Sequence, residues 1–458
     1  MAQQAPLAVV VLAAGQGTRM KSGLVKVLHE VAGRPMLGHV LGAVEPLEPA
    51  RLVVVIGRDG EAVAEAFAGR ATFVEQGELR GTGHAVQQTE AALADFRGDV
   101  LLIYGDVPLV RASTLQQLRE RKAQAGAELA MLTTTLPLPG IVMRDGAGRV
   151  SRVVEVTDAT PAELAVREFN TGVYLVDAER LWKALAQLDD GNAQGEFYLT
   201  DIVAGCVAEG LPVEAVCMED PDEALGVNTR SELARAGNVL RQRTAERLMD
   251  EGVTIVDPGH TWIDVDVRVG RDTRIEPGVM LTGPTVIGER AHLKAHTVVE
   301  SSQLGDDVVV GPSAHVRPGC RLARGVRVGN FVEVKNSDLG EGVKADHLAY
   351  IGDADVGAGA SFGCGSIVVN YDGVAKHRTR VGERAFVGCN ANLIAPLELA
   401  EDTYVAAGST ITQDVPGQAL AVGRARQRNV EGWVRRRGTA AQQAASKARG
   451  DDEGPDAT

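Results

Sequence analysis

This 458-residue chain lacks a long hydrophobic run and an excess of positive charge. Its longest early apolar run, from Leu7 to Ala14, is too short to cross a membrane, and no basic segment precedes it as in a signal peptide. The net charge of -14, from 47 basic and 61 acidic residues, argues against a protein that binds nucleic acid through its phosphates. We therefore expect a cytoplasmic protein that has neither a membrane nor a nucleic acid as its partner.

Disulfide and zinc frameworks are missing as well, because the five cysteines are scattered, odd in number and without a C-x-x-C pair. Aromatic residues make up only 4% of the chain, which suits an α/β sheet or a solenoid with an aliphatic core. The length leaves room for two or three domains, each large enough for its own core.

An aliphatic residue recurs at every sixth position through the C-terminal half of the chain. The spacing slips by one residue after Val299, resumes at Leu304, and returns from Val381 to Ile411. Neither a helical period nor simple strand alternation produces this spacing. A parallel β-helix does, because each flat face contributes one inward side chain per repeat and the next coil stacks on it. We expect this β-helix over residues 253–424.

The N-terminal half, residues 1–228, shows a different pattern. Buried strands are predicted at residues 7–13, 52–57 and 100–104, with helical stretches between them. Strand, helix, strand in this order indicates a Rossmann-like, mostly parallel α/β sheet, whose ligand should lie beyond the carboxyl ends of the strands.

Two further segments follow these patterns. A linker helix is predicted over residues 229–252, where Thr229 and Glu232 have the spacing of a capping box. The tail, residues 425–458, is polar, and we expect it to be largely disordered.

A glycine-rich loop follows the first predicted strand, in the segment from Leu12 to Met20. Its small residues let the backbone approach a phosphate closely. The Arg19 guanidinium can form paired hydrogen bonds to a diphosphate, and the Lys26 ammonium adds a single positive charge. The loop matches neither the Walker A motif nor the dinucleotide fingerprint. Taken alone, such a turn is structural roughly half the time.

Three more segments accompany this loop: Gln76 with Gly81-Thr82-Gly83-His84-Ala85, Tyr104-Gly105-Asp106-Val107-Pro108-Leu109, and Gly226-Val227-Asn228. With these motifs and the β-helix, the chain resembles the bifunctional N-acetylglucosamine-1-phosphate uridyltransferase and glucosamine-1-phosphate acetyltransferase family from Leu7 to Trp433. The resemblance implies a left-handed hexapeptide β-helix, a homotrimer, and synthesis of UDP-N-acetylglucosamine from glucosamine 1-phosphate, acetyl-CoA and UTP for cell-envelope polysaccharide.

In the N-terminal domain the resemblance implies a uridylyl-transfer site with Arg19 and Lys26 as catalytic residues. Asp106 and Asn228 would ligate Mg²⁺. The residues implied for binding the sugar nucleotide are Leu12, Ala13, Ala14, Gly15, Lys26, Gln76, Gly81, Thr82, Tyr104, Gly105, Asp106, Gly140, Glu155, Asn170 and Asn228.

In the β-helix the resemblance places His347 at the catalytic position, as the general base that takes a proton from the sugar amine. Arg317 and Lys335 would neutralise the phosphate of glucosamine 1-phosphate. The remaining residues implied for the sugar and for acetyl-CoA are Tyr350, Ser361, Cys364, Asn370, Tyr371, Cys389, Ala407 and Arg424.

The chain departs from the family pattern at several of these positions. Val25 stands where the family has Pro before the loop lysine, and Pro139-Gly140-Ile141 stands where it has Tyr-Gly-Arg. Ser361, Cys364 and Cys389 replace Asn, Ala and Ser. We expect a less rigid loop and a changed sugar contact, while the two cysteines act as small filler in a tight coil.

Two other functions remain open at this point. One is nucleotidyl transfer alone, with the β-helix as a scaffold or regulatory domain. The other is a binding protein without catalysis. Arg317, Lys335 and His347 argue against the scaffold, and the metal-type pair Asp106 and Asn228 argues against simple binding.

Overall fold

The computed structural model describes residues 5–192 and 194–449, which divide into two compact units, one ending at Gly319 and the other beginning at Cys320. This division differs from the boundaries expected at residues 228 and 253, which stay a prediction. Among the described residues, no helix has both the length and the apolar character that crossing a membrane requires.

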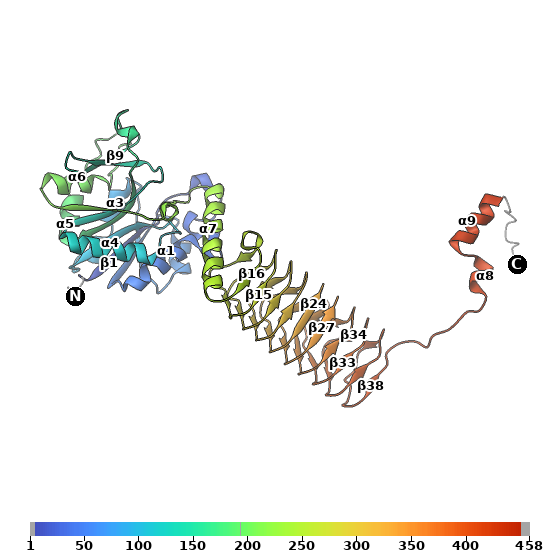
Figure 1. Ribbon diagram of the computed structural model, residues 1–458. Helices are drawn as coiled ribbons and strands as arrows, with labels where there is room; N and C mark the ends of the chain where they lie inside the picture. The colour runs from blue at the N-terminus through green and yellow to red at the C-terminus, as the bar shows by residue number, and fades with distance from the viewer. Residues whose placement is uncertain (1–4, 193, 450–458) are drawn as a thin grey trace. The chain divides into compact units, whose positions relative to one another are not determined.

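The first unit contains a mixed β-sheet, which includes β1 (Figure 1). Its strand order is β11-β7-β10-β6-β1-β4-β5. All of its neighbouring strands are parallel except β10, which runs antiparallel to β6 and β7. A hairpin of β8 and β9 extends from β10. The strands are β1 Leu7–Leu12, β4 Arg51–Ile56, β5 Thr72–Glu75, β6 Asp99–Tyr104, β7 Leu129–Thr134, β8 Gly140–Arg144, β9 Val150–Glu155, β10 Phe169–Asp177 and β11 Val213–Cys217.

Both faces of this sheet are covered by helices. Along β1, Val9 and Val11 pack into one core, whereas Ala8, Val10 and Leu12 pack into the core on the opposite face. Burial on both faces explains why the strand is apolar without alternation. The helices are α1 Met36–Val44, α2 Glu61–Ala66, α3 Thr82–Gln87, α4 Ala112–Ala125, α5 Ala178–Leu185 and α6 Asp201–Ala208.

Helix α7, Arg230–Asp250, follows the sheet domain and begins with a capping box. The Thr229 side chain accepts from the Glu232 backbone N–H, and the Glu232 carboxylate accepts from the Thr229 backbone N–H. A short hairpin, β2 Glu30–Val31 and β3 Arg34–Pro35, contacts the solenoid that follows α7, where Arg34 forms an ion pair with Asp266.

Parallel coils of short strands make up the rest of the first unit. Ile263 pairs with Leu281, and Leu281 pairs with Val299, so every third repeat returns to the same face. These aliphatic side chains are buried. The strands are β12 Thr254–Ile255, β13 Trp262–Ile263, β14 Arg268–Val269, β15 Arg274–Ile275, β16 Met280–Thr282, β17 Val286–Ile287, β18 His292–Leu293, β19 Val298–Glu300, β20 Gln303–Leu304, β21 Val309–Val310 and β22 His315–Val316.

The second unit repeats the pattern and adds one insertion. Val356 on β29 pairs with Val381 on β32 because residues 370–378 interrupt the repeat between β31 and β32. The strands are β23 Arg321–Leu322, β24 Arg327–Asn330, β25 Glu333–Lys335, β26 Asp338–Leu339, β27 Lys344–His347, β28 Tyr350–Gly352, β29 Ala354–Val356, β30 Ser361–Phe362, β31 Ile367–Val369, β32 Thr379–Val381, β33 Phe386–Val387, β34 Asn392–Ile394, β35 Leu397–Leu399, β36 Tyr404–Val405, β37 Thr410–Ile411 and β38 Leu420–Ala421.

The tail carries two helices, α8 Trp433–Arg437 and α9 Ala440–Arg449. The sequence alone gave no signal for them. Residues 450–458 lie outside the described residues, so the expectation of a largely disordered tail stays a prediction there.

Candidate active sites

A cavity of about 290 Å³ lies at the carboxyl edge of the N-terminal sheet. Leu12 at the end of β1 pairs with Val55 of β4 and with Tyr104 of β6, so the loops after these strands emerge together. The predicted residues that line this cavity are Leu12, Ala13, Ala14, Gly15, Lys26, Gln76, Gly81, Thr82, Tyr104 and Asp106. The glycine-rich loop and the β6 motif therefore meet at one edge, as the open-sheet rule requires.

A second cavity, of about 680 Å³, shares part of this lining and extends to Gly57–Gly60 and to Ser22–Val25. The buried side chain of Gln76 lines both cavities. Its amide nitrogen donates to the Gly81 carbonyl at 3.2 Å and lies 3.1 Å from Nδ1 of His84. These contacts fix the orientation of an amide that can read the polar edge of a ligand.

Lys26 lies between two oxygen-bearing side chains at the cavity wall. Its ammonium forms an ion pair with Asp106 and donates to Oδ1 of Asn228 at 3.1 Å. The positively charged Lys26 ammonium therefore lies between the carboxylate and the amide that are predicted to hold Mg²⁺. The two oxygens fit a hard cation that takes its other ligands from water and from substrate phosphates. Among the described residues, no group of three or more His, Cys, Asp or Glu side chains has metal-site geometry, so the substrate phosphates would have to complete the site.

The capping box of α7 positions Asn228. Its backbone N–H donates to Oε2 of Glu232 at 2.8 Å, the same oxygen that accepts from Thr229. Burial raises the pKa of Glu232, but the hydrogen bonds from Asn228 and Thr229 outweigh it and the pKa lies below its usual range. Arg19, predicted to be catalytic, is exposed outside the lining of both cavities. Its charge also lowers the pKa of Glu232.

Three predicted sugar contacts lie in one row across β10, β8 and β9. Asn170 pairs with Gly140, and Gly140 pairs with Glu155. The amide nitrogen of Asn170 donates to the Tyr174 hydroxyl at 2.7 Å. Burial raises the pKa of Glu155, and the carboxylates of Asp158 and Asp201 raise it further.

Tyr104 depends on a glycine in the neighbouring strand. Gly172 of β10 has φ +76°, and a Cβ there would lie 2.1 Å from the Tyr104 ring. Burial and, to a lesser extent, Asp106 raise the pKa of Tyr104, so its hydroxyl stays protonated. Gly105, predicted with Tyr104, follows it directly, and its backbone N–H donates to the Leu12 carbonyl at 2.9 Å.

In the second unit, His347 ends β27 with an exposed side chain. Asn330 of β24 pairs with His347, and its Oδ1 lies 3.0 Å from Nδ1 of the imidazole. An amide oxygen can only accept, so Nδ1 carries the proton and Nε2 keeps a lone pair. This is the tautomer that a general base requires.

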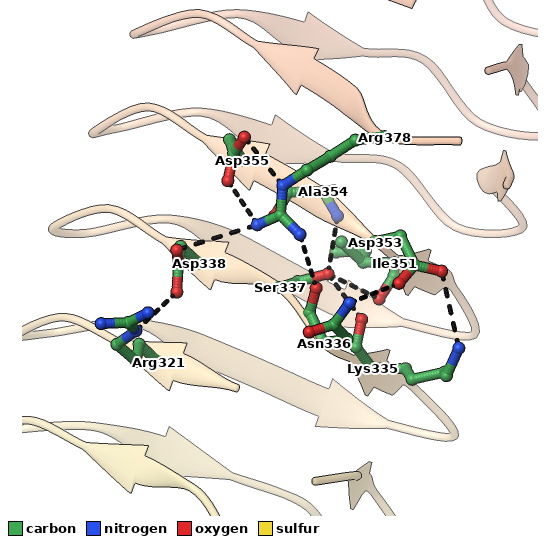
Figure 2. Close-up of polar contacts among 10 residues, drawn as sticks. All are labelled: Arg321, Lys335, Asn336, Ser337, Asp338, Ile351, Asp353, Ala354, Asp355 and Arg378. Atoms are coloured by element: carbon green, nitrogen blue, oxygen red, sulfur yellow. Dashed lines mark hydrogen bonds and ion pairs between the residues drawn. The ribbon is translucent and has the colours of Figure 1, made fainter. Parts of the chain in front are cut away.

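Lys335, Tyr350 and Asn370 meet around the buried carboxylate of Asp353. Lys335 and Asp353 are joined by an ion pair of 3.5 Å, drawn in Figure 2. The Asn370 amide donates to Asp353 and also to the Tyr350 hydroxyl at 3.3 Å. Burial disfavours the charge on Asp353, but hydrogen bonds from Asn336 and Asn370, with the charge of Lys335, bring its pKa below its usual range.

The residues predicted for acetyl-CoA lie on one corner of successive coils. Phe362 pairs with Val387, and Val387 pairs with Val405, so the positions two residues later are stacked: Cys364, Cys389 and Ala407. All three are exposed, and both cysteines are free thiols, so the expectation that Cys364 and Cys389 act as small filler in a tight coil is wrong. Ser361 starts β30, and Arg424 follows β38 as an exposed residue.

Two predicted residues are less closely tied to this group. Tyr371 is 55% exposed and donates to the Gly373 carbonyl at 2.7 Å. Arg317 belongs to the first unit, where its carbonyl accepts from Ser302, and its place in the second site stays a prediction.

Sequence reasoning missed three residues at the second site. Asn330, which orients the imidazole, and Asp353 carry no signal in a six-residue period, because the period reports inward aliphatic positions. The third, Lys376, comes within hydrogen-bonding range of Lys335. The sequence signal that could have identified Lys376 is the occurrence of a lysine in the polar segment that interrupts the repeat. Two basic side chains that lie this close together favour an anionic ligand.

Comparison with known protein families matches both halves. Residues 9–199 match the MobA-like NTP transferase domain, and residues 301–336 match the bacterial transferase hexapeptide of six repeats. The second match agrees with the predicted left-handed β-helix.

Full-length relatives are similar over nearly the whole chain. A protein of Pelobacter propionicus named bifunctional protein GlmU is 47% identical over 449 residues, covering 93% of this chain and 98% of the relative. Proteins of the same name from Geobacillus thermodenitrificans and Listeria monocytogenes are 46% and 45% identical, each over 93% of this chain and 97% of the relative.

Proposed function

The chain belongs to the family of bifunctional GlmU proteins, which are uridyltransferases and acetyltransferases, and we propose how its two sites divide these reactions. The β-helix site transfers acetyl from acetyl-CoA to glucosamine 1-phosphate. The sheet site then transfers uridylyl from UTP to N-acetylglucosamine 1-phosphate and releases pyrophosphate. The product, UDP-N-acetylglucosamine, supplies cell-wall polysaccharide synthesis.

Uridylyl transfer is a displacement at phosphorus. A phosphate oxygen of N-acetylglucosamine 1-phosphate attacks the α-phosphorus of UTP, and the bond to pyrophosphate breaks. Backbone N–H groups of the loop at Gly15 hold the nucleotide phosphates, and Lys26 and Arg19 neutralise charge on the transferred group. Asn170 and Glu155 read the sugar hydroxyls through hydrogen bonds. Catalysis rests on positioning and charge, with no covalent intermediate.

Mg²⁺ is the proposed cofactor of this site, held by Asp106 and Asn228. When bound, it would neutralise the phosphates of UTP as a Lewis acid. Lys26 then releases these oxygens and turns toward the phosphates. The support is the placement of the Lys26 ammonium between the two oxygens, at 3.1 Å from Asn228.

Acetyl transfer begins with proton removal from the sugar amine by Nε2 of His347. The amine nitrogen attacks the thioester carbonyl, the carbon–sulfur bond breaks, and coenzyme A leaves as the thiol once the His347 imidazolium returns the proton to its sulfur. Asn330 holds the imidazole in the basic tautomer throughout. Lys335 and Lys376 bind the sugar phosphate, while the corner at Cys364, Cys389 and Ala407, with Ser361 and Arg424, carries acetyl-CoA.

One observation carries this division of labour: an oriented imidazole stands on the coils that also bring Lys335, Tyr350 and Asn370 together. A β-helix that served only as a scaffold would need no base beside a phosphate-type cation. The experiment is to incubate the purified chain with glucosamine 1-phosphate, acetyl-CoA, UTP and Mg²⁺ and to identify the products by mass spectrometry. UDP-N-acetylglucosamine is expected. A parallel reaction without UTP should accumulate N-acetylglucosamine 1-phosphate, and no N-acetylated product in either reaction would rule out the acetyltransferase.

The working form that we propose is a cytoplasmic homotrimer. Flat β-helix faces pack well in threes, and the five free cysteines suit a reducing compartment. Light scattering on the eluted protein would test the assembly, since a monomer at micromolar concentration contradicts it.

A further inference from the structure

Asp353 is a buried carboxylate that the proposed reaction does not use. It lies in the turn between β28 and β29 with φ 50° and is 7% exposed. A buried carboxylate is costly unless its oxygens are satisfied. Both oxygens have partners: Oδ1 accepts from the Asn336 amide at 2.6 Å, and Oδ2 lies 3.5 Å from the Lys335 ammonium (Figure 2). Oδ2 also accepts from the Asn370 amide.

These partners come from three successive coils. Lys335 ends β25, which pairs with β28 before Asp353, and Asn370 follows β31, which pairs with β28 on the other side. Asp353 therefore joins the phosphate-binding lysine of one coil to the insertion that begins on another.

The chemistry of a carboxylate also fixes the orientation of Asn370. A carboxylate only accepts hydrogen bonds, so the amide nitrogen of Asn370 must face Asp353. The same nitrogen donates to the Tyr350 hydroxyl at 3.3 Å. Both side-chain amide hydrogens of Asn370 then have partners inside the protein. The side-chain oxygen, Oδ1, is the atom of this amide that can accept a hydrogen bond from a ligand.

We propose that Asp353 is a positioning residue for glucosamine 1-phosphate: it holds the Lys335 ammonium for the phosphate and makes Asn370 present its oxygen to the amino sugar. This inference rests on the proposed acetyl transfer at this site. The carboxylate acts through its two partners and does not touch the reacting atoms.

A neighbouring carboxylate offers a matched control. Asp355 accepts from Nε of Arg378 at 2.9 Å and forms an ion pair with its guanidinium, which fastens the far end of the same insertion (Figure 2). Its side chain is 41% exposed. Asp355→Asn therefore loosens the insertion by the same chemical change, while Lys335 and Asn370 keep their contacts.

The test compares Asp353→Asn, Asp355→Asn and the unaltered full chain in both reactions, with thermal unfolding as a readout of stability. Asp353→Asn should raise the KM for glucosamine 1-phosphate at least tenfold and change the KM for acetyl-CoA and the rate of uridylyl transfer less than twofold. Asp355→Asn should stay within about twofold in all of them. Equal losses in the two variants, or equal changes in both KM values, would overturn the proposal and make Asp353 a structural anchor.

A second variant covers the case in which Asp353→Asn fails to fold. Asn336→Ala removes the donor that holds Oδ1, so the Asp353 carboxylate is free to turn away from Lys335 and Asn370. It should raise the KM for glucosamine 1-phosphate threefold or more, and an unchanged KM would overturn the proposal. An unaltered chain without acetyl transfer would refute the proposed function itself, whereas an active chain with an unaffected Asp353→Asn variant refutes only the positioning role.

Discussion

The two sites are built by opposite means. In the sheet domain, residues far apart in the chain converge on a cavity because parallel strands end at one edge: Gly15 follows β1, Asp106 follows β6, and Asn228 precedes α7. In the β-helix, the site consists of neighbours on successive coils, together with one insertion that interrupts the repeat. A solenoid with regular coils offers a flat surface, so its chemistry gathers where the repeat fails.

The comparison implies different sensitivities to substitution. The sheet site depends on the packing of strands and helices around a cavity. The β-helix site depends on a few polar contacts between side chains that lie outside the aliphatic core. Single substitutions should therefore separate the two activities cleanly.

The largest effect is expected for His347→Ala. Removal of the general base should lower acetyl transfer by about 100-fold to 10,000-fold, because this is the usual contribution of such a group. Uridylyl transfer from UTP should be unchanged, measured as pyrophosphate release with N-acetylglucosamine 1-phosphate. A parallel fall in both rates would contradict separate sites.

Asp106→Asn should have the reverse selectivity. It keeps the shape of the side chain but removes the negative charge beside Lys26 and the proposed metal ligand. We expect uridylyl transfer to fall roughly 100-fold, within the range for a lost electrostatic contact in an active site. Acetyl transfer on the same preparation is the control, and a uridylyl rate near that of the unaltered chain would exclude Asp106 as a ligand.

Asn330→Ala removes only the partner of the imidazole. The rate constant kcat for acetyl transfer should fall about tenfold, the equivalent of one hydrogen bond of about 1.4 kcal/mol. The KM for acetyl-CoA should not change. Asn392→Ala, which removes an exposed amide bonded to Thr410 on a later coil, is the control; a similar loss there would mean that Asn330 acts through general stability.

Gly172→Ala tests how the sheet supports Tyr104. The new methyl group would meet the ring at 2.1 Å in a left-handed backbone conformation, so unfolding should become easier by about 1–3 kcal/mol. Gly126→Ala separates the two causes, because Gly126 has φ +58° with open space around its Cβ. Chemical denaturation should show the greater loss for Gly172→Ala, and equal losses would assign the cost to backbone conformation alone.

Glu155→Gln should give the smallest effect, and one that depends on pH. Burial raises the folded-state pKa of Glu155, so the folded protein binds its proton more tightly and loses stability as pH rises through this pKa. The Gln variant should therefore be more stable above this pKa, by about 1 kcal/mol or less, and equal to the unaltered chain below the pKa of the unfolded chain. Hydrogen bonds from Thr160 lower the pKa of Glu163, so Glu163→Gln should change stability in the opposite direction. The same sign for both would contradict the burial argument.

Much of the β-helix can be predicted from the sequence, because the six-residue period marks the inward side chains that stack from one coil to the next. The six-residue spacing predicted the inward positions, and the same register brings Cys364, Cys389 and Ala407 to one corner. The site around Asp353 escaped prediction, since a polar side chain outside the repeat can turn in any direction. Its contacts depend on a turn with positive φ and on the path of the insertion.

In the sheet domain, the sequence predicted the loops that form the site, but it did not predict how the strands run or which side chains meet. The apolar runs predicted β1, β4 and β6 within one or two residues, and the motifs predicted which loops meet a ligand. The antiparallel β10 and the contact of Lys26 with both Asp106 and Asn228 required the tertiary structure. A strand sequence does not encode its direction in the sheet, and a flexible lysine can reach several partners.

A complementation experiment tests the existence of two independent sites most directly. His347→Ala and Asp106→Asn are each incubated with glucosamine 1-phosphate, acetyl-CoA, UTP and Mg²⁺, and then mixed in equal amounts, with UDP-N-acetylglucosamine measured by mass spectrometry. Each variant alone should form little product, and the mixture should recover a substantial part of the rate of the unaltered chain. A mixture no more active than its components would contradict two separate sites.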